Sequence, residues 1–132
     1  MGASAVSSYQ LSDAGDLTVI DSSASTKQTA ACWLVLSYDG HFVYTANAGS
    51  ASLSGFRVQP PGSLKLLHAS GASATTGAHP ADMSFSHDGR RLFSLNNGDG
   101  TISGFMVKPN GELGADGSLG GLPNTSAGLA AW

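Results

Sequence analysis

Charged side chains are scarce in this chain of 132 residues: Asp, Glu, Lys and Arg together make up 11%, against about 25% in an average soluble protein. There are six basic and nine acidic residues, the net charge is −3, and the basic residues form no cluster. Because neutralisation of phosphates dominates affinity for nucleic acids, the sequence predicts no nucleic-acid partner. The 41% of hydrophobic residues argues against a disordered chain.

A single cysteine, Cys32, excludes an internal disulfide and a cysteine-rich metal site, and we expect neither a metal nor a cofactor. Its position in the apolar run 30–36 predicts a small buried side chain rather than a reactive thiolate. This run is too short to span a bilayer, and the first residues lack the pattern of a signal peptide. The sequence predicts a soluble chain, cytoplasmic as expressed and without a membrane partner, and leaves the physiological compartment open.

The chain contains an internal repeat. A shift of 49 residues places Ser37-Tyr38-Asp39-Gly40 on Ser86-His87-Asp88-Gly89, and 12 of the 28 positions from Ser37 to Leu64 are identical. A partial copy precedes these units at a shift of 47 residues. It aligns Val6, Tyr9, Leu11, Gly15 and Leu17 with Leu53, Phe56, Val58, Gly62 and Leu64. Residues 126–132 resemble the opening of a further copy.

Each repeat predicts four short β-strands separated by turns. In the first full unit they are expected at residues 32–37, 42–46, 52–58 and 64–69. Asp39-Gly40 and Pro60-Pro61-Gly62 are typical turn sequences. Four antiparallel strands in a repeat of about 40 to 50 residues are typical of a β-propeller blade. A solenoid is the alternative, but its repeats are shorter or helical.

We therefore expect one all-β domain over residues 1–132, built of four-stranded antiparallel propeller blades, roughly three per chain. Its parts are a partial blade at 5–30, full blades at 31–79 and 80–125, and the opening strand of a shared blade at 126–132.

The repeated motif Ser-x-Asp-Gly, followed by Asn-x-Gly, Ser-Gly-Phe and Pro-x-Gly-x-Leu, resembles the bacterial lactonase-type seven-bladed β-propellers. These are the phosphogluconolactonase-like proteins with YVTN repeats. The resemblance covers essentially the whole chain and implies a C-terminal fragment of about a third of such a propeller. It also implies that His, Glu and Arg side chains around a central channel open or close a lactone. Asp82 stands where the family motif has His, and Asn96-Asn97 replaces an Asn-Glu pair, so neither position is carried over as catalytic.

Two to three blades cannot close a circle, which predicts exposed strand edges near both ends of the chain. Closed cyclic symmetry is the usual way to cover such edges. We therefore expect a ring closed by homo-oligomerisation, in which residues 126–132 of one copy complete the blade begun by the N-terminal strands of the next. A dimer of about six blades is the first expectation and a trimer of about nine the second.

Ligands of propellers usually bind at the channel mouth, where the blade-connecting loops meet the turns between second and third strands. The ligand-binding candidates there are Lys27, Asn47, Asn96 and Asn97, with Asn124 nearby. His79 and Asp82 are the catalytic candidates, because a carboxylate near an imidazole raises its basicity; a polar loop residue is the alternative for His79. The residues His41, His87, Arg90 and Arg91 belong to the opposite end of the blades.

Two functions stay open. The first is a self-assembling propeller fragment with a structural or ligand- or protein-interaction role and no efficient catalysis. The alternative is a lactonase- or esterase-type hydrolase that acts on a lactone or simple ester in the channel, which needs an acid–base pair and a cation for the oxyanion. Lys27 is the only obvious cation at the mouth. A module that binds sugars or peptides through Trp33 or Trp132 is weaker, because both tryptophans are expected in core strands.

Overall fold

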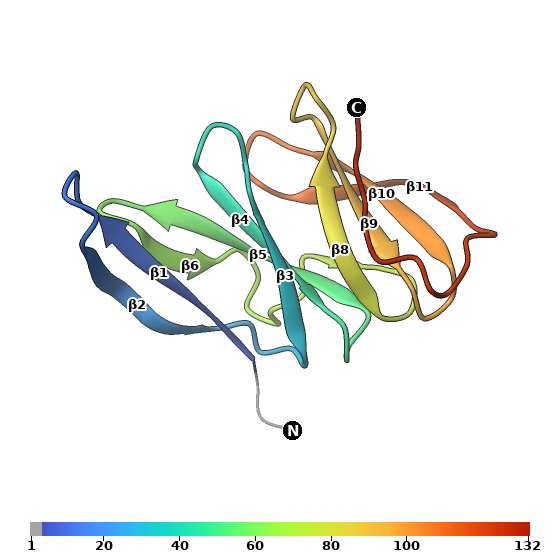
Figure 1. Ribbon diagram of the computed structural model, residues 1–132, viewed down its shortest axis with the longest axis horizontal. Helices are drawn as coiled ribbons and strands as arrows, with labels where there is room; N and C mark the ends of the chain where they lie inside the picture. Colours follow the sequence, from blue (N-terminus) through green and yellow to red (C-terminus); the bar gives the residue numbers. More distant parts are fainter. Residues whose placement is uncertain (1–3) are drawn as a thin grey trace.

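The computed structural model describes residues 4–132, which form eleven β-strands and no helix. The strands make three antiparallel sheets that follow one another along the chain and lie side by side (Figure 1). The first sheet contains β1 (Ala5–Leu11) and β2 (Leu17–Ser25). The second contains β3 (Ala31–Leu36), β4 (Phe42–Asn47), β5 (Ser52–Gln59) and β6 (Ser63–Leu66), with the short β7 (Ala74–Thr75) paired to β5. The third contains β8 (Pro80–Phe85), β9 (Arg91–Asn96), β10 (Thr101–Val107) and β11 (Leu113–Leu119).

The all-β architecture confirms the prediction, and the three sheets correspond to about three propeller blades, of which the first has only two strands. Consecutive strands pair in the order of the chain, as four-stranded blades require. With no helix in residues 4–132, this part of the chain offers no candidate for a membrane-spanning helix.

The repeated Ser-x-Asp-Gly motif forms the turn between the first two strands of each full sheet, as predicted. The Ser37 hydroxyl donates to Asp39 Oδ1 at 2.6 Å, and the same oxygen accepts the backbone N–H of His41 at 3.0 Å. Ser86 and Asp88 repeat this arrangement in the third sheet, again at 2.6 Å. The following glycine has a positive φ in both turns, which a side chain would disfavour.

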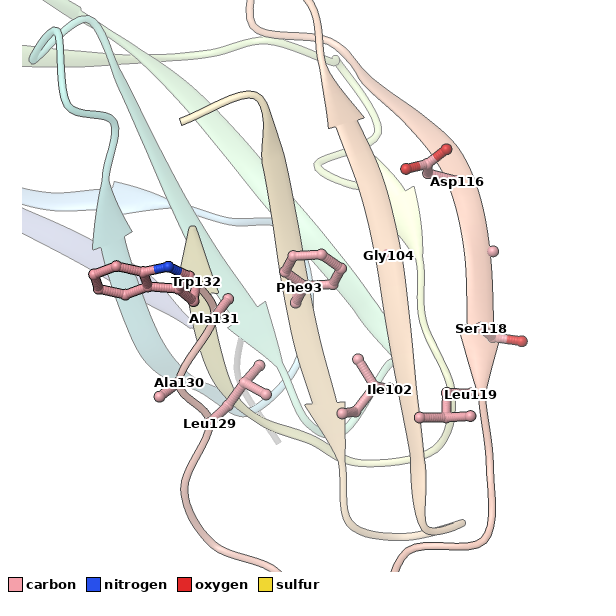
Figure 2. A pocket seen from close by; sticks show the side chains of 11 residues that line it. Phe93, Ile102, Gly104, Asp116, Ser118, Leu119, Leu129, Ala130, Ala131 and Trp132 are labelled. Atoms are coloured by element: carbon pink, nitrogen blue, oxygen red, sulfur yellow. The ribbon is translucent and has the colours of Figure 1, made fainter. Parts of the chain in front are cut away.

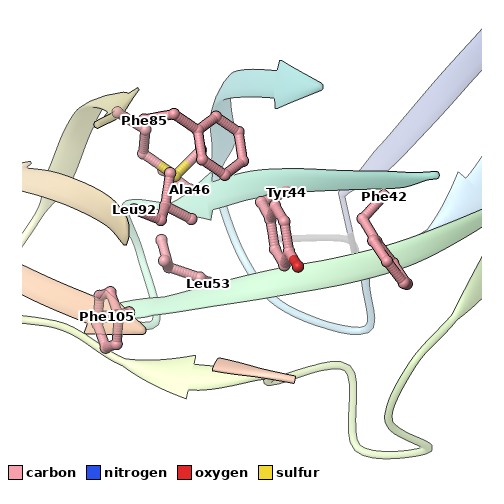
Figure 3. Close-up of a cluster of buried hydrophobic side chains, with 8 residues drawn as sticks. Phe42, Tyr44, Ala46, Leu53, Phe85, Leu92 and Phe105 are labelled. Atoms are coloured by element: carbon pink, nitrogen blue, oxygen red, sulfur yellow. The ribbon is translucent and has the colours of Figure 1, made fainter. Parts of the chain in front are cut away.

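The largest buried cluster lies between the second and third sheets (Figure 3). Its members are Phe42, Tyr44, Ala46, Leu53, Met83, Phe85, Leu92 and Phe105. A smaller cluster of Val6, Val43 and Phe56 joins the first and second sheets. Side chains alternate between the two faces of a strand, so neighbours in β4 such as Val43 and Tyr44 serve different junctions.

Three details of the predicted strands are wrong. Residues 126–132, expected as the opening strand of a shared blade, form no strand in the structure. The expected strand 32–37 is not buried: in β3, Cys32, Leu34 and Leu36 are exposed and Trp33 retains 47% of its accessible surface. The reason is that β3 is the edge strand of its sheet, and the first sheet lacks the strands that would cover it. The fourth strand is shorter than predicted, since β6 ends at Leu66 and the chain bends before it reaches β7.

Candidate functional site

His79 lies in the loop before β8, at the end of the sheets where the channel mouth was predicted. Its imidazole Nδ1 contacts the side-chain oxygen of Asn97, in the turn after β9, at 2.8 Å. His79 is exposed and has a φ of 55°. The backbone N–H of Asn97 also donates to the carbonyl of His79 at 3.2 Å. In the part of the chain that the structure describes, these two are the one pair of predicted site residues joined by a hydrogen bond.

Asp82 is buried and has other partners than His79. Its Oδ2 accepts the backbone N–H of Leu129 at 2.7 Å, and its Oδ1 accepts the N–H of Met83 at 2.7 Å. His79 precedes β8 in a left-handed backbone conformation, whereas Asp82 lies within the strand. No hydrogen bond therefore joins the candidate acid–base residues within residues 4–132, and their catalytic role stays a prediction.

Asn47 and Asn96 occupy equivalent places at the ends of β4 and β9, and both are fully buried. The Asn96 amide donates to the hydroxyls of Thr101 and Ser103, at 3.0 and 2.9 Å, and its oxygen accepts from Ser94 at 3.1 Å. Each amide thereby links the end of its own strand to the following strand of the same hairpin. A ligand-binding role for these two side chains stays a prediction.

The amide of Asn47 has one partner fewer than that of Asn96. It donates to Ser52 and Ser54, at 3.2 and 2.9 Å, but its buried oxygen has no protein partner in the described residues. The residue that corresponds to Ser94 is Thr45, whose hydroxyl donates instead to the carbonyl of Trp33 at 2.8 Å.

Lys27 is exposed in the loop between β2 and β3, with a φ of 57°. Its ammonium group donates to the carbonyl of Ala69 at 2.9 Å, and the neighbouring Gln28 amide donates to the carbonyl of Ser70 at 3.0 Å. The loop is thus tied to the segment after β6. Among residues 4–132, no group of three or more His, Cys, Asp or Glu side chains is placed to hold a metal ion.

Both tryptophans lie on the surface, which corrects the prediction that they belong to core strands. Trp132 is 97% exposed and stacks on the His87 ring, with 5.1 Å between the ring centroids. Cys32 is also exposed rather than buried, and its Sγ lies 3.4 Å from the carbonyl oxygen of Pro80. Partial burial raises the pKa of this thiol, which disfavours a reactive thiolate.

A pocket on the outer face of the third sheet was missed by the sequence analysis (Figure 2). It has a volume of about 480 Å³ and lies between the β9–β11 surface and the C-terminal segment 129–132. The lining is mainly apolar, with Phe93, Ile102 and Leu119 from the sheet and Leu129 from the segment. The repeat carried a signal for it, because Phe93 and Ile102 are equivalent to Tyr44 and Leu53, which pack against another sheet.

The family model described as lactonase, 7-bladed beta-propeller, matches residues 3–119. A comparison with curated proteins finds no match.

Solved structures share the fold at low sequence identity. A protein from Lactobacillus plantarum is 20% identical, with a TM-score of 0.76 over 92% of this chain and 37% of its own. The periplasmic gluconolactonase of Pseudomonas aeruginosa is 22% identical, with a TM-score of 0.71 over 89% of this chain and 34% of its own. A putative 6-phosphogluconolactonase from Bacteroides fragilis is 23% identical, with a TM-score of 0.71 over 91% and 33%. The chain thus spans about a third of the length of these structures.

Proposed function

Because the chain belongs to the lactonase family of seven-bladed β-propellers, we propose that it is a propeller fragment that assembles with copies of itself. Its role in this proposal is structural, or lies in the interaction with a small ligand or protein, without efficient catalysis. Assembly is proposed to close a ring, first as a dimer and second as a trimer.

The exposed apolar side chains support the assembly. The outer sheets expose Tyr9, Leu11, Leu17 and Val19 in the first sheet, and Met106 and Leu119 in the third. In the second sheet, the exposed Trp33, Leu34 and Leu36 belong to the edge strand β3. The second sheet, which has a neighbour on each side, contains the fully buried strand β4. Large contiguous apolar surfaces of this kind mark interaction sites.

The hydrogen-bond partners of the candidate residues support the proposal that catalysis is inefficient. Lactone opening needs a base near an acid and a cation near the developing oxyanion. Here the Asp82 carboxylate is occupied by the backbone N–H groups of Met83 and Leu129, while His79 contacts a neutral amide. The Lys27 ammonium group donates to the carbonyl oxygen of Ala69, in the segment after β6.

A hydrolase of lactones or simple esters is the competing function, and membership of the lactonase family favours it. The Pseudomonas aeruginosa structure is that of a gluconolactonase. Fold transfers between relatives more safely than activity, so the competing function needs its own test.

The test measures hydrolysis of a sugar lactone and of a nitrophenyl ester by the unmodified chain and by His79→Ala and Asp82→Ala. The exposed His41, at the opposite end of the sheets, gives the matched control His41→Ala. We expect all four proteins to hydrolyse both compounds at the buffer rate. A rate well above buffer that is lost in His79→Ala or Asp82→Ala, but kept in His41→Ala, would establish the hydrolase instead.

A further inference from the structure

The two junctions within the chain are of one kind. We call the face that a sheet packs against the next sheet along the chain its forward face. The opposite face, which packs against the preceding sheet, is its backward face. Between the second and third sheets, the forward face contributes Phe42, Tyr44 and Leu53, and the backward face Phe85 and Phe105. Between the first and second sheets, Val6 of the forward face meets Phe56 of the backward face.

The outer sheets each expose the face that has no partner within the chain. The repeat places Phe93, Ile102 and Gly104 of the third sheet on Tyr44, Leu53 and Gly55, so its forward face borders the open pocket. In the first sheet, the exposed Tyr9, Leu11 and Leu17 align with Phe56, Val58 and Leu64, which pack on the sheet before them. One end of the chain is therefore an unfilled forward face and the other an unfilled backward face.

The glycine in the turn between the third and fourth strands of each blade shows the same difference between a packed face and an open one. A Cβ at Gly62 would lie 2.7 Å from Ile20 of the preceding sheet, and one at Gly111 would collide with the Phe42 ring. Gly111 also accepts, through its carbonyl, the hydroxyl of Tyr44 at 2.8 Å. Gly15 holds this position in the first sheet and also has a positive φ, but nothing lies within 4 Å of its Cβ position.

The forward face of the third sheet has a cation, Arg91, that is paired with a carboxylate of the same sheet. Phe42, which touches Gly111, is replaced in the third sheet by Arg91. Its guanidinium lies on the forward face, 2.6 Å from the Asp116 carboxylate that borders the pocket. A hairpin docked as in the internal junction would bring Gly15, with Asp13 and Asp16 beside it, to Arg91.

The C-terminal segment covers only the inner part of this forward face. Leu129 and Ala131 donate their backbone N–H groups to Asp82 and Ser84 of β8, at 2.7 and 3.3 Å. By the 49-residue repeat, Leu129 and Trp132 hold the positions that Pro80 and Met83 hold one unit earlier. The segment thus lies where the first strand of a following sheet would begin, and the pocket beside it stays open (Figure 2).

From these observations we infer a head-to-tail interface between two copies of this chain. The backward face of the β1–β2 hairpin of one copy docks in the pocket on the forward face of the third sheet of the next, with Gly15 against Arg91. The inference rests on the self-assembly proposed above and specifies its geometry. The contact is heterologous, so its repetition generates a ring where the rotation closes.

Two variants that each disable one face test the geometry. Leu11→Glu/Leu17→Glu places charge on the exposed backward face of the hairpin. Leu119→Glu places charge on the forward face, where Leu119 pairs with Ile102 as the packed Ala74 pairs with Leu53. All three leucines are more than 60% exposed, so both variants should fold, which circular dichroism checks. Gln59→Glu, an exposed position in the middle sheet, is the matched control.

Light scattering should give an oligomer for the unmodified chain and the control, and a single chain for each face variant. An equimolar mixture of the two variants should recover a mass that approaches two chains, because each supplies the face that the other lacks. A mixture that stays at one chain, while the unmodified protein is oligomeric, would overturn the head-to-tail interface and leave the self-assembly standing. An unmodified protein that is itself a single chain would overturn both.

Discussion

The middle of this molecule and its N-terminal hairpin are built from the same repeat and yet differ in burial. Five of the eight residues of β5 are buried, whereas only one of the seven residues of the equivalent strand β1 is. Phe56 and Tyr9 hold equivalent positions, and the first is 1% exposed while the second is 52% exposed. A neighbouring sheet, rather than the sequence of the strand, decides which apolar residue becomes core.

The largest effect should come from truncating an aromatic residue inside a junction. Phe56→Ala removes a ring packed against Val6 and Val43 and is expected to lower the free energy of unfolding by about 3–5 kcal/mol. The matched change Tyr9→Ala, measured in the Leu119→Glu background to keep the chain monomeric, should alter it by only about 0.5 kcal/mol. Urea unfolding followed by circular dichroism measures both. Equal losses would mean that the hairpin face is already packed in a single chain.

The turn glycines sharpen the comparison at a second pair of positions. Gly111→Ala introduces a methyl group against Phe42 in a left-handed backbone, and we expect a loss of about 3 kcal/mol or more. Gly15→Ala has the same backbone strain but open space, so in the monomeric background it should cost only about 1 kcal/mol. Thermal and urea unfolding of the two variants give the difference. A Gly15→Ala variant as unstable as Gly111→Ala would contradict the open surface.

The sequence predicted the blades well because their signals are local and occur twice. Asp39-Gly40 and Asp88-Gly89 are turns in the structure, and the strands around them pair in the order of the chain. The burial of β3 could not be predicted, because an apolar strand such as Cys32–Leu36 has the same pattern whether or not a neighbour covers it. The same reason explains the exposed Trp33 and Trp132.

The candidate site could be predicted only as a set of loop positions. The contact of His79 with Asn97 depends on how the loop before β8 meets the turn after β9. The engagement of Asp82 by Leu129, 47 residues away, depends on the path of the C-terminal segment. Neither distance has a local signal in the sequence.

The smallest expected effect concerns the acidic turns that the second and third sheets share. The hydroxyls of Ser37 and Ser86, together with backbone N–H groups, hold the pKa values of Asp39 and Asp88 below their ordinary range. A carboxyl group whose pKa is lowered by folding stabilises the protein above its unfolded pKa, and this stabilisation is lost as the pH falls through the folded pKa. Asp39→Asn/Asp88→Asn should therefore lower the midpoint of thermal unfolding at neutral pH and leave it nearly unchanged in strong acid. A loss of equal size at both pH values would show that the turns act without their charge.

The central claim is that an unfilled forward face and an unfilled backward face of this chain complete one another between copies. Sedimentation equilibrium of the unmodified chain over a range of micromolar concentrations tests it most directly. We expect a closed assembly, with a mass of two chains first and three chains second. A well-folded single chain at every concentration would contradict it.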